Sequence, residues 1–179
     1  MTSEERVAWA AAVLAYSSRV SRVLAYITRA YARPWPAGGY PVQMSAYSNW
    51  AGAYSTKGDL LVVSTLDPAT DGMLGFETLF HEAMHQWEGP VFDELIAHAR
   101  RLGIRVSGRL THAMIFYTAG EAVRSVDAAH VPYAQAVGVW GRGMAAFRTA
   151  LQETWKSWLD GRGTRDDALG ALAAKTAFR

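Results

Sequence analysis

The residues best suited to chemistry lie together in the five-residue run His81-Glu82-Ala83-Met84-His85. The surrounding apolar pattern predicts a helix, and residues i and i+4 of a helix lie about 40° apart and one turn up, so both imidazoles can reach one ion. Glu82 lies about 100° round the helix, where it can face a water in the open position of a metal. The spacing predicts one Zn²⁺ ion bound by His81 and His85, with Glu82 as general base.

The third ligand has to come from another part of the chain. The chain has no cysteine, and Glu88 and Val91 occupy the positions where one short-range scheme needs a glycine and a third histidine. Two later residues remain open, His112 and Glu121, and on one continuous helix they face opposite sides, so only one can face the zinc. We expect Glu121, because a carboxylate in so apolar a helix needs a partner and a metal supplies one.

The elements that must position these residues begin with a predicted helix over 3–31, which starts with Glu4 and Glu5 in its first turn. Short strands are predicted at 40–45, 51–55 and 60–65, with a hairpin turn at 56–59 between the last two. Four further helices are predicted at 74–88, 91–102, 110–126 and 133–159, and a last one over about 164–178. In the helix at 133–159 a kink is possible near Gly138, Gly141 and Gly143. Residues 1–179 therefore form one α+β domain, mostly helical, with a small antiparallel or mixed sheet before the motif helix.

With a glutamate on a following helix, the motif resembles that of the zincin metallopeptidases, of the gluzincin type. The resemblance implies a zincin-like fold, His81, His85 and Glu121 as zinc ligands, and Glu82 as general base. It also implies an edge strand about thirty residues before the motif that pairs with extended substrate backbone. The segment at that distance here contains Trp50, Ala51, Gly52 and Ala53, which we expect to bind substrate.

One position departs from the family pattern. Many gluzincins have an acid four residues after the third ligand, and that position is Ser125 here. The group that orients a motif histidine is therefore unassigned, and three acids are possible: Glu77, Glu88 and Asp93. A hydrolase of this kind also needs a donor to the oxyanion, and the possible donors are Tyr117, His130 and Tyr133.

Composition limits the partners. The net charge of +2 comes with no clustered Lys and Arg, so we expect no nucleic-acid binding. The apolar run at 7–16 is too short to span a bilayer, and acids precede it where a signal peptide has bases. We expect a cytoplasmic protein, or an exported one if a leader was removed before Met1.

The function that these observations favour is zinc-dependent hydrolysis of a peptide or another amide-containing substrate. The alternative is a zinc-binding protein without catalytic activity on a zincin scaffold, which the short chain and the missing acid at Ser125 favour. The sequence indicates neither cleavage specificity nor oligomeric state.

Overall fold

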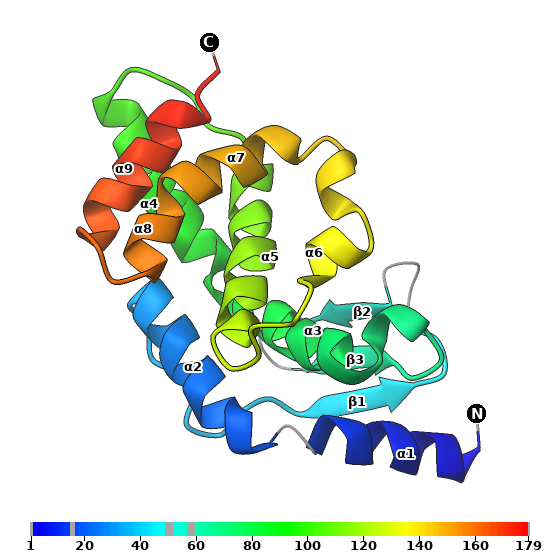
Figure 1. Cartoon of the computed structure of the whole chain (residues 1–179). Helices are drawn as coiled ribbons and strands as arrows, with labels where there is room; N and C mark the ends of the chain where they lie inside the picture. The colour runs from blue at the N-terminus through cyan, green and yellow to red at the C-terminus, as the bar shows by residue number, and fades with distance from the viewer. Residues whose placement is uncertain (1, 15–16, 49–51, 57–59, 179) are drawn as a thin grey trace.

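The computed structural model describes residues 2–14, 17–48, 52–56 and 60–178. Helices predominate, and a small sheet precedes most of them in the sequence (Figure 1). This arrangement confirms the expected α+β class and the position of the sheet before the motif helix.

Two helices, α1 (Ser3–Leu14) and α2 (Ser17–Tyr31), occupy the region where one helix was predicted. Residues 15 and 16 lie outside the described residues. Serine favours helix starts over helix interiors, in keeping with a new helix that begins at Ser17. Helix α2 contributes Val23, Ile27 and Tyr31 to the core, and their side chains are fully or almost fully buried.

The three predicted strands are confirmed with shorter bounds: β1 (Val42–Ser45), β2 (Ala53–Ser55) and β3 (Leu61–Ser64). Strand β3 is central, parallel to β1 and antiparallel to β2. All four of its residues are buried, as expected for a strand with neighbours on both sides. Because β3 lies between the other two, β2 forms an edge of the sheet among the described strands. Part of the predicted hairpin turn, residues 57–59, lies outside the described residues.

The motif lies at the end of α3 (Gly72–Met84), which continues as a 3-10 turn, His85–Trp87, into α4 (Glu88–Arg101). The predicted break between the helices at 74–88 and 91–102 was wrong, because Gly89 and Pro90 lie within α4. Pro90 lies in the first turn of α4, where a missing N–H costs nothing because first-turn N–H groups have no partner within the helix.

Helix α5 (Arg109–Arg124) passes through the middle of the molecule, with α3 packed against it (Figure 1). Small and apolar side chains line most of its length, and Ala113, Met114 and Ala119 have no exposed surface. The indole N–H of Trp155 donates a hydrogen bond of 3.0 Å to Thr118 Oγ1, which satisfies two polar groups inside the core.

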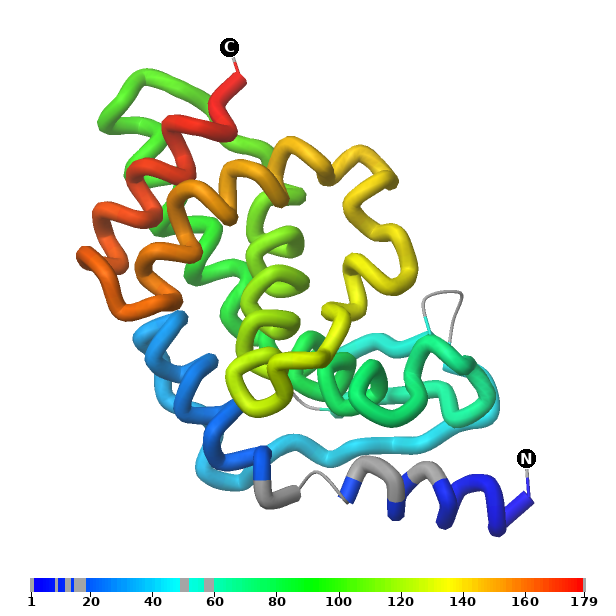
Figure 2. The backbone as a smooth tube through the Cα atoms, in the orientation of Figure 1, coloured from blue at the N-terminus to red at the C-terminus, as the bar shows by residue number. Residues whose placement is uncertain are grey.

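The predicted helix over 133–159 is instead a series of short helices: α6 (Tyr133–Ala136), a 3-10 turn (Val139–Gly141), α7 (Ala145–Glu153) and α8 (Trp155–Leu159). Gly138 and Gly143 have φ angles of 71° and 79°, which end helical geometry and favour glycine. The chain then turns into α9 (Arg165–Lys175), capped by Thr164. Figure 2 shows the α6–α7 segment, yellow at α6 and turning orange at α7, arching beside α5.

Candidate metal centre and cleft

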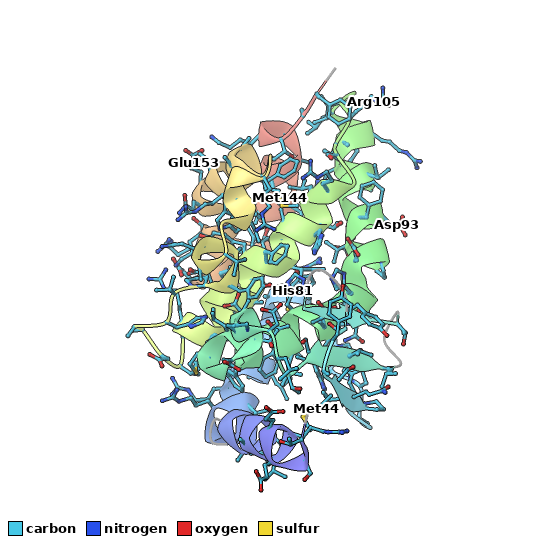
Figure 3. The ribbon with its side chains drawn as sticks, turned by 90° about the vertical axis from the view of Figure 1, so that its right-hand side faces the viewer. Met44, His81, Asp93, Arg105, Met144 and Glu153 are labelled. Carbon is cyan, nitrogen blue, oxygen red and sulfur yellow. The ribbon has the colours of Figure 1, made fainter. Side chains whose placement is uncertain are left out.

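Three histidines converge at one point between α3 and α5. His81 and His85 come from the end of the motif helix and His112 from the first turns of α5, and their ligand atoms all lie within 4.8 Å of one another. The Nε2 atoms of His81 and His112 are 3.3 Å apart. Figure 3 shows His81 near the middle of the molecule, between the labelled Met144 and Met44. This cluster could hold a metal ion.

The separation of two of these nitrogens fits a tetrahedral ion. Two imidazole nitrogens that each bind Zn²⁺ at about 2.0–2.1 Å in a tetrahedral site lie about 3.3–3.4 Å from each other. The 3.3 Å between His81 Nε2 and His112 Nε2 matches this separation. Nδ1 of His85 is engaged elsewhere, which leaves its Nε2 for the ion.

Burial keeps two of the three imidazoles neutral, as metal ligands must be. It lowers the pKa of His81 well below its usual value of 6.5, with help from the nearby charges of His85 and His112. Burial and the charge of His85 lower the pKa of His112 to about 4. Burial also acts to lower the pKa of His85, but its hydrogen bond with Glu88 and the nearby carboxylates outweigh that effect and raise it.

Glu88 is the acid that orients a motif histidine. Its Oε2 lies 3.0 Å from His85 Nδ1, and its Oε1 accepts a 3.3 Å hydrogen bond from Thr111 Oγ1. A carboxylate on the far nitrogen of a ligating imidazole fixes the ring and its tautomer. Of the three acids that the sequence left open, Glu88 is the one that contacts a motif histidine. Asp93 is exposed on α4, and Glu77 pairs with another histidine.

Glu82 lies beside the cluster with only 8% of its surface exposed. Its Oε1 is 4.0 Å from His81 Nε2, and burial raises its pKa to about 7 despite the charge of His85 and a hydrogen bond from Ser55. The carboxyl group therefore has the position expected of a general base, next to the point where the three histidines converge.

A cleft of about 820 Å³ opens over these groups. Edge strand β2 forms one side of it through Ala53, Tyr54 and Ser55, and the α6–α7 segment forms another. The remaining lining residues come mainly from α3, α5 and the loop before α3: Asp67, Ala69, Thr78, His81, Glu82, His85, Glu88, Arg109, His112 and Phe116.

The structure corrects the choice of third ligand. Glu121 faces away from the motif histidines, and its carboxylate pairs with Arg124 at 3.2 Å and Lys156 at 3.4 Å. It lines a separate cavity on another side of α5. The two residues do face different sides of one helix, as the sequence indicated, but His112 is the one that reaches the cluster. The partners of the half-buried Glu121 carboxylate are Arg124 on the same helix and Lys156 from α8.

Among the three possible oxyanion donors, only Tyr133 lines the cleft. Tyr117 lies on the Glu121 side of α5, in the second cavity. His130 is buried, with its Nε2 2.5 Å from Glu77 Oε2, and the backbone N–H of Tyr133 donates to the same oxygen at 2.9 Å. His130 therefore contributes to the position of Tyr133 rather than to the cleft.

The predicted substrate-binding residues have mixed positions. Trp50 and Ala51 lie outside the described residues. Gly52 has a φ of 80°, its carbonyl accepts a 2.7 Å hydrogen bond from Ser64 N–H, and a Cβ there would lie 2.6 Å from Asp67 Oδ2, so it has a structural reason to be glycine. Ala53 lines the cleft.

Several residues of the cleft were missed in the sequence, among them Ser55, Arg109 and Arg142. Arg109 lies three positions before His112, one helical turn away. If His112 had been chosen as the third ligand, Arg109 would have been expected close to the same site. No signal near Arg142 or Ser55 marks them, because their positions depend on how distant elements pack.

Among the described residues, no helix has both the length and the apolar character needed to cross a membrane. No family model, curated protein or solved structure matches the chain.

Proposed function

We propose that this protein is a zinc-dependent hydrolase of peptide or other amide bonds. The observation that supports this most directly is the convergence of His81, His85 and His112 beside the Glu82 carboxylate in the wall of a cleft. Three histidines with an open fourth position are a ligand set of catalytic zinc sites.

Zinc, when bound, supplies a Lewis acid and lowers the pKa of a coordinated water. The protein supplies the rest. Glu82 accepts a proton from the attacking water and delivers it to the leaving nitrogen. Glu88 holds the ring of His85 so that its Nε2 faces the ion.

Tyr133 serves as the donor to the oxyanion. It lines the cleft on the side of the α6–α7 segment, and burial raises its pKa, so its hydroxyl keeps its proton at neutral pH. A neutral hydroxyl can donate a hydrogen bond where negative charge develops on the substrate carbonyl.

Edge strand β2 supports an extended substrate. One of its sides pairs with β3, and Ala53, Tyr54 and Ser55 line the cleft. An edge strand next to a catalytic group can add a substrate segment by backbone hydrogen bonds. This favours a peptide over a compact small molecule.

The test is the variant Glu82→Gln, measured for zinc content and for hydrolysis of a peptide mixture. We expect about one zinc per chain in both proteins, and a loss of rate of roughly 10²–10⁴-fold in the variant, which is the usual contribution of a general base. Wild-type protein that takes up no zinc would refute the proposal. Zinc-loaded wild-type protein that cleaves nothing would favour the catalytically silent alternative.

A further inference from the structure

Two arginines in the cleft carry positive charge without a carboxylate to balance it. Arg109 begins α5, and Arg142 follows the 3-10 turn before α7. Arg109 Nη2 donates to the carbonyl of Arg142 at 3.2 Å, and Arg142 Nη2 donates to the carbonyl of Val137 at 3.0 Å. These bonds position the guanidinium groups but leave their charge intact. Within the part of the chain that the structure describes, neither arginine forms an ion pair.

The described acids of the cleft pair with neither arginine. Glu88 pairs with His85, Glu82 lies 4.0 Å from His81, and Asp67 Oδ1 accepts the N–H of Ala69 in its own turn. The free charge on the arginine side of the cleft is therefore positive, which suits an anionic group on the substrate.

An apolar wall lies next to the two arginines. Val137, Val139 and Met144 come from the segment that contains Arg142, and Phe116 lies one helical turn after His112. Val139 and Met144 are each 8% exposed, so the wall is firmly packed. An apolar side chain bound against this wall would place its own backbone close to the arginines.

We propose that this part of the cleft binds the C-terminal residue of a peptide, with the arginine pair on its carboxylate and the apolar wall against its side chain. Guanidinium groups bind carboxylates through paired hydrogen bonds, which gives direction as well as affinity. The inference rests on the proposed hydrolase function and adds that the protein acts at peptide C-termini.

The distances along α5 agree with cleavage near the chain end. Residues three apart on a helix have Cβ atoms about 5–6 Å apart, and this is the spacing of Arg109 and His112. An extended peptide advances about 3.3 Å per residue. This spacing is compatible with a carboxylate held by Arg109 one or two residues beyond a carbonyl near the histidines.

The reaction is ordinary hydrolysis. The water oxygen forms a bond to the scissile carbonyl carbon, the C–N bond breaks, and the proton taken from the water goes to the leaving nitrogen. The products are a shortened peptide with a new carboxylate and a released amino acid or dipeptide, without any change of oxidation state.

Binding to the metal-free protein tests the anion site apart from zinc and from turnover. The probes are 3-phenylpropanoate and its neutral amide, titrated by NMR chemical shifts into wild type, an Arg109→Gln/Arg142→Gln double variant, and an Arg148→Gln control. Arg148 is a half-buried arginine on α7 that lines the other cavity. We expect the carboxylate to bind roughly tenfold more tightly than the amide in wild type and control, from charged hydrogen bonds of about 1.5 kcal/mol. We expect no preference in the double variant.

Turnover of zinc-loaded protein gives the second readout. Matched peptides ending in Phe or Asp, as free acids and as amides, are compared by mass spectrometry of the products. We expect release of one or two residues, with the free acid ending in Phe preferred at least tenfold over its amide, and this preference lost in the double variant.

Equal cleavage of acids and amides would overturn the inference and leave the proposed hydrolase intact. Failure of zinc uptake would overturn the proposed hydrolase function. The metal-free titration would still decide whether the two arginines bind a carboxylate. Equal binding of acid and amide by the wild-type protein, or an equal loss in the Arg148→Gln control, would also refute the site.

Discussion

Replacing His112 and Glu121 separately by alanine compares the two possible third ligands within one helix. His112 Nε2 lies 3.3 Å from His81 Nε2, whereas the Glu121 carboxylate pairs with Arg124 and Lys156. We expect His112→Ala to weaken zinc binding strongly and Glu121→Ala to leave it unchanged.

The magnitude follows from the number of ligands. Four-ligand zinc sites bind with roughly 10–16 kcal/mol, or about 2.5–4 kcal/mol per ligand. Loss of one histidine should weaken zinc binding roughly 60- to 700-fold. Glu121→Ala removes two partly exposed ion pairs, each of which stabilises the fold by about 1 kcal/mol or less. Only a small fall in thermal stability is therefore expected.

The assay is competition for zinc against a chromophoric chelator, with circular dichroism as the check that each variant is folded. The matched pair controls for the general effect of a substitution on α5. Unchanged zinc affinity in His112→Ala, or a large loss in Glu121→Ala, would refute the assignment of the histidine cluster as the metal site.

Three further predictions concern the groups around the site and the core. Glu88→Gln should weaken zinc binding about 10- to 100-fold, the usual effect of losing an orienting carboxylate, and the same competition assay measures this. Gly120→Ala should destabilise the fold by about 1–3 kcal/mol, because the new Cβ would lie 2.6 Å from Pro132 Cβ, and a denaturant titration tests it. An unchanged midpoint would contradict that close contact. Burial raises the pKa of Tyr31 and Tyr117 above the usual 10.0. Their contribution to stability is therefore complete below pH 10.0 and is lost as the pH rises further, because the unfolded chain ionises first. Tyr31→Phe should reduce this alkaline loss of stability, and equal loss in the variant would contradict the reasoning.

The motif and the strands could be predicted from the sequence because their signals are local. The spacing of His81 and His85 on a helix is enough to bring both imidazoles to one side. The alternation and apolar runs before the motif indicated all three strands, which have shorter bounds among the described residues.

The third ligand could not be chosen correctly because the choice depended on a distant residue. The cost of an unpaired carboxylate at Glu121 was a sound argument, but it did not specify the partner. Lys156 supplies that partner from α8, thirty-five positions later. The position of the cleft arginines also could not be predicted from local sequence. Arg142 reaches the cleft because Gly138 and Gly143 break the expected long helix.

Helix α3 contacts α5 and the segment after it at two points along its length. Toward the C-terminal end, His81 and His85 meet His112, and one turn before His81, Glu77 binds His130 and the N–H of Tyr133. A slide of α5 by one turn, about 5.4 Å, would break the first of these contacts and strain the second. The ligand positions are therefore preorganised by the packed core. Metal uptake should need little reorganisation of the chain, and its rate should depend on access through the cleft rather than on a folding step.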